Sequence, residues 1–316
     1  MISGEKILLT GASGHVGMKL GAFLARENEV WGLARFASNR AGAMNTAPRG
    51  ADEVKAAGMR PVAVDLGAPD FTDLPSDFTY LLHLSHTRRG PDEFIEAVDI
   101  NAVGAGLLLQ HCRKAKAALV VSSTAVYSPP ADVFKALDER SDIGRAWAPW
   151  APSSPVSKVS LEAVARFCAQ AFDLPVSLMR LNTLYGPGMD VMPNLNMDTV
   201  ARGEPVTTFA DPYPHSPIHI DDMCDHIEPL LGAASAHPAN IVNWCGDEVV
   251  TQRQWCDYAA EWSGKPAQLV VNPIPGTPNG NVSDPTKRKS ITGPCTRPFK
   301  ESFRAIYEGR HGAPLA

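Results

Sequence analysis

The sequence has no long apolar run and no paired-cysteine motif, and both absences exclude broad classes of protein. No stretch approaches the roughly 18 consecutive apolar residues that a membrane-spanning helix needs. The amino-terminal residues MISGEKILLTG carry no basic region and no cleavage site of the kind found in signal peptides. The six cysteines are scattered without a C-x-x-C pair, which disfavours a disulfide framework or a metal site. We therefore expect a soluble, cytoplasmic protein with reduced thiols.

An excess of positive charge is also missing. The 316 residues include 29 lysines and arginines against 34 aspartates and glutamates, which gives a formal net charge of −5. This balance argues against nucleic-acid binding and favours a small-molecule substrate. Apolar residues make up 44% of the chain and charged residues 20%, which is ordinary for a folded protein of one large or two smaller domains.

What the first half of the sequence does contain is a regular alternation of apolar runs and helix-like segments. Near-continuous apolar strands that alternate with helices indicate a parallel sheet covered on both faces. The expected strands are Lys6–Thr10, Glu29–Leu33, Pro61–Val64, Tyr80–Leu84, Leu119–Ser122 and Val176–Leu181. The expected helices are Val16–Arg26, Arg49–Ala57, Phe94–Lys116 and Pro155–Phe172. The predicted fold class is α/β, with a doubly wound parallel sheet.

A glycine-rich turn follows the first expected strand. The segment Thr10-Gly-Ala-Ser-Gly-His-Val-Gly17 lies between that strand and the first helix. Glycines at these positions permit a tight turn, close approach of the backbone to a pyrophosphate and close packing of the helix on the sheet. The positive end of the helix dipole would then face the phosphates. The residues expected to contact a dinucleotide here are Gly11, Ser13, Gly14, His15, Val16 and Gly17.

The end of the second strand indicates which dinucleotide is bound. An acidic residue at this place would hydrogen-bond the ribose 2′-hydroxyl of NAD. This sequence instead has Arg35, with Arg40 nearby. Arginine can bind a 2′-phosphate in a bidentate manner, whereas a carboxylate would repel it. The sequence therefore favours NADP. The alternative is that Arg35 is a surface arginine without a role in cofactor binding.

The composition of the sequence changes after Tyr185, where prolines and glycines become frequent and helical patterns become shorter. One strand at Asn240–Trp244 and one helix at Thr251–Ser263 are the regular elements expected in this part. We expect residues 1–180 to form a dinucleotide-binding domain, with a returning segment around 219–245. Residues 181–316 are then expected to form a smaller, loop-rich substrate lobe.

With the glycine turn and several further motifs, the chain resembles the extended short-chain dehydrogenase/reductase family, also called the NAD-dependent epimerase/dehydratase family. The further motifs are Asp65-Leu66, His83-Leu84-Ser85, Asp99-Ile100-Asn101, Val121-Ser-Ser-Thr-Ala-Val-Tyr127, Arg180-Leu-Asn-Thr-Leu-Tyr-Gly-Pro-Gly188 and His219-Ile-Asp-Asp222. The resemblance implies a Rossmann-type fold. The further cofactor contacts that it implies are Asp65, Leu66, Leu84, Ser85, Asn101, Lys158 and Asn182.

The family's reaction centre consists of a serine or threonine, a tyrosine and a lysine, the last two spaced Y-x-x-x-K. The resemblance places Ser123 on the first of these, and Lys158 on the lysine that holds the nicotinamide ribose and lowers the tyrosine pKa. Ser154 stands where the tyrosine belongs. A serine hydroxyl is shorter and far less acidic than a phenol, so Ser154 cannot fill this role unaided.

The missing proton donor has three candidate replacements: water held at Ser154, His86 just past the fourth strand, and Tyr127. Each has a plainer interpretation. Either Ser153 or Ser154 could cap the following helix, His86 could be a loop histidine without a role, and Tyr127 could pack at a strand end. Ser123 could likewise only satisfy the local backbone.

These observations favour an NADP(H)-dependent oxidoreductase that transfers a hydride to or from a small carbonyl, alcohol or enone. Reduction of an enone fits best, because the enolate needs oxyanion stabilisation more than an immediate proton. One alternative is an epimerase or dehydratase with tightly bound NAD(P), and another is an NADP-binding regulator without turnover. Sugar-nucleotide members of the family carry R-D-F where this chain has His215-Ser216-Pro217, which weakens a sugar-nucleotide prediction.

The resemblance also implies a homodimer formed by the helices around 94–114 and 155–172. The apolar residues that could supply its interface are Leu107, Leu108, Leu109, Val159, Leu161, Val164 and Phe167. The same residues could instead face the sheet. Before the second of these helices, Trp147 and Trp150 could line an apolar pocket or anchor a proline-rich loop.

Overall fold

The computed structural model describes residues 2–36, 49–144, 147–148 and 151–313, so Arg40 and Trp150 lie outside the described residues. The chain divides into two compact units. The first comprises Met1–Val126, Trp150–Arg180 and Cys224–Val242, and the second comprises Tyr127–Pro149, Leu181–Met223 and Asn243–Ala316. Each unit is built from several separate segments of the chain.

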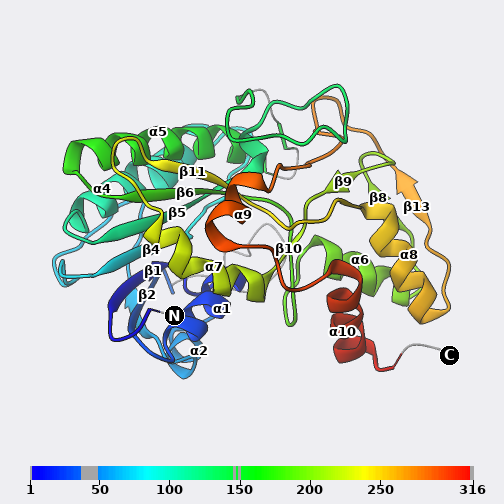
Figure 1. Ribbon diagram of the computed structural model, residues 1–316, viewed down its shortest axis with the longest axis horizontal. Helices are drawn as coiled ribbons and strands as arrows, with labels where there is room; N and C mark the ends of the chain where they lie inside the picture. The colour runs from blue at the N-terminus through cyan, green and yellow to red at the C-terminus, as the bar shows by residue number, and fades with distance from the viewer. Residues whose placement is uncertain (1, 37–48, 145–146, 149–150, 314–316) are drawn as a thin grey trace. The chain divides into compact units, whose positions relative to one another are not determined.

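The first unit is organised around a seven-stranded sheet in the order β11-β6-β5-β4-β1-β2-β3 (Figure 1). Its strands are β1 (Lys6–Thr10), β2 (Glu29–Ala34), β3 (Arg60–Ala63), β4 (Tyr80–His83), β5 (Ala117–Ser123), β6 (Val176–Leu181) and β11 (Asn240–Trp244). The pairs β1–β2, β1–β4, β2–β3 and β4–β5 are parallel. The strand order reverses between β1 and β4, and ligands of such sheets bind beyond the carboxyl ends of the strands at this switch point. The Rossmann-type fold class is confirmed.

Helices cover both faces of this sheet, with α4 and α5 over one face and α1 and α2 over the other (Figure 1). They are α1 (His15–Leu24), α2 (Ala51–Ala56), α3 (Phe94–Val98), α4 (Gly104–His111) and α5 (Ser154–Phe172). The core between sheet and helices includes Leu8, Leu81 and Leu161, which are completely buried. Burial of each such side chain contributes about 1.5–3 kcal/mol.

The helix predicted over Phe94–Lys116 is interrupted. A π-helical turn, Asp99–Val103, separates α3 from α4, which ends at His111. The π-helical turn inserts one residue into the regular winding, and such turns are frequent at functional sites. Amphipathic spacing alone did not predict this interruption.

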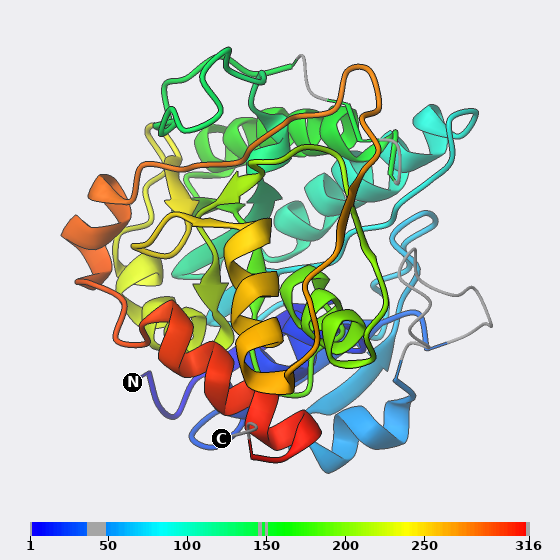
Figure 2. The same ribbon diagram turned by 90° about the vertical axis from the view of Figure 1, so that its right-hand side faces the viewer.

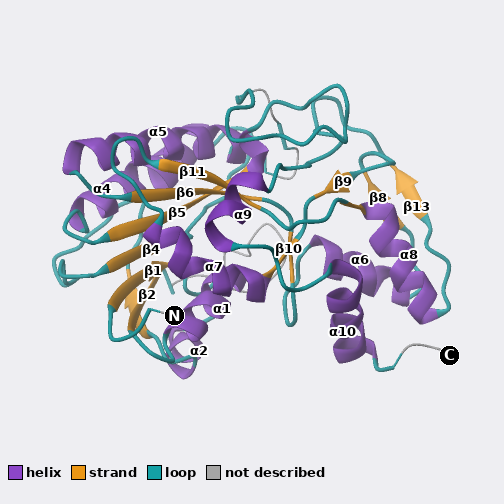
Figure 3. Ribbon diagram, in the orientation of Figure 1, coloured by secondary structure: helices purple, strands orange, loops and turns teal. Residues whose placement is uncertain are grey.

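The second unit contains more regular structure than predicted (Figure 3). Its strands are β7 (Leu184–Tyr185), β8 (Val206–Thr208), β9 (Pro214–His215), β10 (Ile218–His219), β12 (Val250–Thr251) and β13 (Leu269–Val271). Its helices are α6 (Met192–Ala201), α8 (Gln252–Ser263), α9 (Thr286–Thr292) and α10 (Phe299–His311), and α7 (Ile220–Gly232) begins in this unit.

Helices α6, α8 and α10 pack together around an aromatic core (Figure 2). Trp255, Phe299 and Phe303 are buried in this core, where Phe299 and Phe303 stack with ring centroids 5.0 Å apart. The buried residues of α10 are Phe299, Phe303, Ile306 and Tyr307, a helical spacing that the sequence displays although no helix is predicted there.

The six cysteines are free, and five of them are buried. Across the described ranges, no helix combines the length and the apolar character that crossing a bilayer requires.

Candidate active site

In the turn after β1, the positions of Gly11 and Gly17 leave no room for a side chain. Gly11 has a φ of +72°, and a Cβ atom there would lie 3.1 Å from the backbone nitrogen of Ser85. A Cβ atom on Gly17 would lie 2.1 Å from the carbonyl oxygen of Gly11, which is a steric overlap. Gly14 caps α1 in an extended conformation. The turn and the first turn of α1 therefore pack as tightly as the approach of a pyrophosphate to backbone N–H groups requires, so this part of the chain fits a dinucleotide.

The ends of β1 and β4 are joined by the hydroxyl of Thr10. Its oxygen accepts hydrogen bonds from the backbone N–H groups of Leu84 and Ser85, both at 3.1 Å, and lies 3.0 Å from Nδ1 of His83. Because two donors use its lone pairs, the hydroxyl donates its own proton to Nδ1. Burial and the nearby charge of Lys158 lower the pKa of His83 to about 3, so the imidazole is neutral. The expected cofactor contacts Leu84 and Ser85 thus already use their N–H groups.

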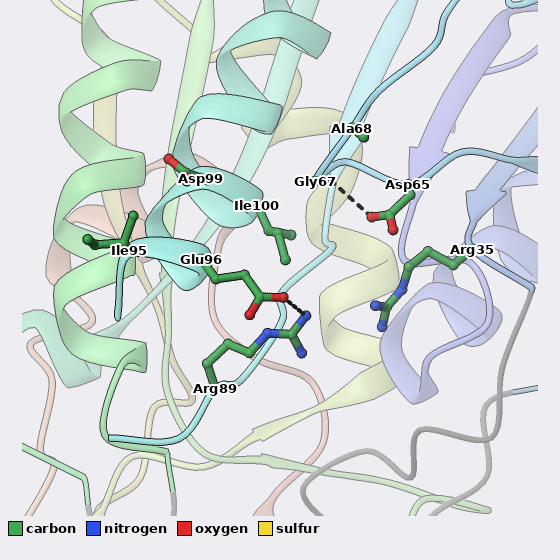
Figure 4. Close-up of a pocket in the computed structure, with 9 residues that line it drawn as sticks. All are labelled: Arg35, Asp65, Gly67, Ala68, Arg89, Ile95, Glu96, Asp99 and Ile100. Atoms are coloured by element: carbon green, nitrogen blue, oxygen red, sulfur yellow. Dashed lines mark hydrogen bonds and ion pairs between the residues drawn. The ribbon is translucent and has the colours of Figure 1, made fainter. Parts of the chain in front are cut away.

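Beyond the ends of β2 and β3 lies a cavity of about 580 Å³. It is lined by Arg35, Asp65, Gly67, Ala68, Arg89, Ile95, Glu96, Asp99 and Ile100 (Figure 4). Arg35 and Asp65 are residues that the sequence predicted for the cofactor, while Leu66 is buried. Asp65 accepts a hydrogen bond from the backbone N–H of Gly67, and Arg89 forms an ion pair with Glu96 at 2.7 Å. Sequence reasoning missed Arg89, because no motif points to it.

The loop that follows β4 is held by two side chains from other elements. Asn101 accepts a hydrogen bond from the backbone N–H of Thr87 and donates one to its carbonyl, both at 2.7 Å. Ser153 accepts from the N–H of Arg89 at 3.1 Å and donates to its carbonyl at 3.0 Å. Asn101, expected to contact the cofactor, thus uses its amide on this loop. Ser153 stands at the N-cap position of α5 but forms no side-chain cap, so the capping interpretation is wrong for this residue.

His86 and Ser154 contact each other. Nε2 of His86 lies 2.7 Å from Oγ of Ser154, so two candidates that the sequence proposed separately share one hydrogen bond. The Nδ1 atom of His86 is buried and has no hydrogen-bond partner among the described residues. Burial holds the pKa of His86 well below 6.5, and the charges of Lys158 and Arg88 lower it further, while Asn101 opposes the shift. The imidazole is therefore neutral at pH 7.

Lys158 is buried beneath the end of β5. Its Nζ donates a hydrogen bond to the carbonyl of Val121 at 2.6 Å. Burial lowers its pKa to about 7, although the carboxylate of Glu162 raises it. Ser123 accepts a hydrogen bond from the N–H of Ala125 at 3.1 Å, as its plainer interpretation expects, and can still donate its own proton.

A buried ion pair supports α5 from the side of the sheet. Arg180 binds Glu162 in a bidentate manner, with Nε 3.0 Å from Oε1 and a terminal nitrogen 2.7 Å from Oε2. Ser122 donates a hydrogen bond to the same carboxylate at 2.7 Å. A buried carboxylate needs such partners, because each lost partner leaves an uncompensated charge. The network ties β5, β6 and α5 together one helical turn after Lys158.

Two predicted residues lie in the second unit, where their polar groups already have protein partners. The amide nitrogen of Asn182 donates to the carbonyl of Asn281 and to Ser283, at 2.9 and 2.8 Å. The hydroxyl of Tyr127 is buried and donates to Asn243 at 2.6 Å. Both side chains hold the second unit together in this structure.

The model of the NAD dependent epimerase/dehydratase family matches residues 7–243. The chain belongs to this family of enzymes. Membership confirms the predicted resemblance and agrees with the glycine turn, the strand order and the buried Lys158. No curated protein matches the sequence.

Solved structures of this family share the fold. A UDP-glucuronic acid 4-epimerase from Bacillus cereus, in complex with UDP-glucuronic acid and NAD, is 22% identical; the similarity covers 96% of this chain and 98% of that chain, with a TM-score of 0.79. The enzyme WbmG from Bordetella bronchiseptica, in complex with NAD and UDP, is 20% identical over 98% of this chain and 96% of that chain, with a TM-score of 0.75. A UDP-N-acetylglucosamine 4-epimerase from Methanobrevibacter ruminantium M1 is 16% identical over 98% and 100%, with a TM-score of 0.77.

Proposed function

We propose that the protein is a nicotinamide-dependent enzyme of the epimerase/dehydratase type that acts on a hydroxylated, sugar-like substrate and retains its cofactor. The observation that carries this proposal is the glycine turn packed without side-chain space at the switch point of the sheet. Family membership and the UDP-sugar epimerases with the same fold favour this function over the small-carbonyl oxidoreductase predicted from the sequence. That oxidoreductase becomes the second candidate, supported by His215 in place of a substrate-binding arginine.

The cofactor would be held along the carboxyl edge of the sheet. The glycine turn would receive the pyrophosphate, Arg35 and Asp65 the adenosine end, and Lys158 the nicotinamide ribose. When bound, a nicotinamide would supply the acceptor and the donor for a hydride of the substrate. We propose NAD, because solved structures with the same fold hold NAD. The carboxylates of Asp65 and Asp99 also line the cavity that a 2′-phosphate would enter, while Glu96 there is paired with Arg89. Binding of NADP through Arg35 stays a prediction that the titration described below tests.

The chain's own groups would orient and polarise the substrate. Ser123 has a proton to donate to a substrate oxygen and would stabilise negative charge there. A protonated Lys158 adds positive charge close to this position and favours the ionised form of the oxygen.

The proposal is tested by the cofactor content of the purified protein. We expect acid denaturation to release about one equivalent of NAD, and fluorescence titration of stripped protein to show tighter binding of NADH than of NADPH. UDP-glucose, UDP-glucuronic acid and UDP-N-acetylglucosamine are then followed by NMR for epimer formation. A cofactor-free protein that oxidises external NADPH with small ketones or enones would favour the second candidate. Bound cofactor without turnover of any substrate would favour a regulator.

We also propose a homodimer through the helices of the first unit. Leu108, Leu109 and Leu161 are buried against the sheet, so they do not supply the expected interface. Exposed apolar side chains nevertheless remain on α3 and α5, where Ile95 is 79% and Phe167 is 68% exposed. We expect light scattering to give twice the monomer mass, and Phe167→Glu to shift it to the monomer mass. A monomeric wild-type protein would contradict this part of the proposal.

A further inference from the structure

We infer that Ser154 and His86 together form a proton relay that performs the task of the missing tyrosine. The inference rests on the proposed function, since it needs a substrate hydroxyl that is oxidised and reduced. Its basis is the 2.7 Å hydrogen bond between Oγ of Ser154 and Nε2 of His86. A serine hydroxyl that contacts a histidine can pass a proton that it could not hold alone.

Both partners of this hydrogen bond are fixed by their surroundings. His86 lies in the loop after β4, whose backbone is held on the carboxyl side at Thr87 by Asn101 and at Arg89 by Ser153. Thr10 holds the same loop on the amino side at Ser85. Ser154 begins α5, so its backbone is part of a 19-residue helix.

The position of Ser154 on α5 places the pair next to the lysine of the site. Ser154 and Lys158 are four residues apart on the same helix and therefore share a face. The charge of Lys158 acts directly on the imidazole of His86. The relay thus occupies the location where the family motif has its tyrosine, four residues before the lysine.

In the tautomer that carries its proton on Nδ1, His86 can accept a proton at Nε2. The O–H bond of the substrate hydroxyl would break and a new O–H bond would form on Ser154, while the original Ser154 proton passes to Nε2 of His86. The imidazole becomes an imidazolium. The substrate carbinol is oxidised to a carbonyl, and its C–H electron pair leaves as the hydride that the nicotinamide accepts. Return of the hydride runs every step backwards, so no proton is lost to solvent.

The charges around His86 suit a proton that is held only briefly. The groups that face the imidazole are Lys158, Arg88, His83 and Asn101. Burial, with the charges of Lys158 and Arg88 added to it, lowers the pKa of His86 and keeps the imidazole neutral before the transfer, which is the state that accepts a proton. These charges also destabilise the imidazolium afterwards, which drives the proton back to Ser154 when the substrate is reduced. Asn101 favours the charged form and limits this cost.

The test compares His86→Gln in two backgrounds. With Ser154 present, we expect His86→Gln to lower kcat at least about 100-fold on the UDP-sugar that turns over fastest, with little change in KM. In Ser154→Tyr, which restores the phenol, His86→Gln should change kcat less than about threefold, because the relay is bypassed. His111→Gln is the matched control, since His111 is also half-buried and binds through Nε2 to one partner, the carbonyl of Pro75.

A second readout needs neither substrate nor cofactor. The imidazole resonances of His86 are followed by NMR over a pH titration of cofactor-free protein, with thermal unfolding as a check on folding. We expect Ser154→Ala to change the tautomer of His86 and the midpoint of its titration.

An equal loss from His86→Gln in both backgrounds would overturn the relay, because His86 would then act only on the structure. A His86 titration that is identical in wild type and Ser154→Ala would also overturn it. Turnover that survives His86→Gln would remove the relay and leave the proposed function intact. Absence of turnover with every UDP-sugar would remove both.

Discussion

The glycine turn after β1 and the first turn of α5 supply two ends of the candidate site by different physical means. At the glycine turn, backbone atoms approach so closely that one added methyl group would overlap them, so sterics decide the residue type. At the start of α5, the geometry depends on hydrogen bonds from Ser153 and Ser154 to the loop after β4. One hydrogen-bond donor can be exchanged for another, whereas the closely packed glycine positions accept no larger residue. This difference agrees with a chain that has the glycines of the motif and carries Ser154 at the position of the tyrosine.

The largest effect is expected where α5 is anchored. Glu162→Gln removes the buried charge that pairs with Arg180, and an uncompensated buried charge costs about 3–5 kcal/mol of stability. The same change removes the interaction that raises the pKa of Lys158, so this pKa should fall. Urea unfolding measures the first effect. The matched control is Glu204→Gln, whose exposed ion pair with Arg202 should contribute little to stability. Equal losses from both substitutions would contradict the assigned role of the buried pair.

A smaller effect on stability is expected at the glycine turn. Gly17→Ala places a Cβ atom 2.1 Å from the carbonyl oxygen of Gly11, and overpacking of this kind costs about 1–3 kcal/mol. The shifted turn should also weaken NADH binding by at least about tenfold, or 1.4 kcal/mol. Fluorescence titration measures the affinity, and Gly309→Ala in α10, where a Cβ meets no neighbour, is the control. Unchanged affinity in Gly17→Ala would show that the turn does not position the cofactor.

His83, near the glycine turn, and Lys158, on α5, should affect the stability of the protein in different pH ranges. His83 beside the turn has a pKa lowered to about 3 from 6.5, so between these values the unfolded chain binds more protons and stability falls as the pH falls. Lys158 on α5 has a pKa lowered to about 7 from 10.5, so its burial penalty is relieved as the pH rises through that range. Each group contributes a slope of up to about 1.4 kcal/mol per pH unit.

We expect His83→Gln to reduce the slope of the acidic limb of the stability curve, to which His86 and His215 also contribute. Lys158→Met should reduce the slope of the alkaline limb, and each substitution should leave the other limb in place. Unfolding free energies from urea titrations between pH 4 and 10 measure both limbs. A variant that flattens the opposite limb, or neither limb, would contradict the assigned protonation states.

The parts of the fold that the sequence predicted well are those that depend on local pattern. The strands Lys6–Thr10 and Val176–Leu181 were predicted to the residue, because buried parallel strands are short apolar runs between breakers. The helix α10 was missed, since its buried stripe of Phe299, Phe303, Ile306 and Tyr307 follows a region rich in proline and glycine. The helical spacing of its apolar residues is visible in the sequence, but the neighbouring prolines and glycines favour a prediction of loops.

For the candidate site, sequence reasoning named His86 and Ser154 but not their contact. The contact depends on the path of the loop after β4, which long-range hydrogen bonds from Asn101 and Ser153 determine. Arg89 and Ser153 are 64 positions apart in the sequence, so no local pattern reveals this pairing. Arg89 and the cavity that it lines were missed for the same reason.

The π-helical turn Asp99–Val103 makes the site sensitive to chain length as well as to residue type. Each residue of a regular helix turns the chain by about 100°, so deleting one residue here would let the helix wind evenly and swing Asn101 away from Thr87. The loop that carries His86 would then lose its hydrogen bonds to Asn101, although the side chains that contact Ser154 would all still be present. Deletion of one residue in this turn would therefore change the position of His86 relative to Ser154 without replacing either residue.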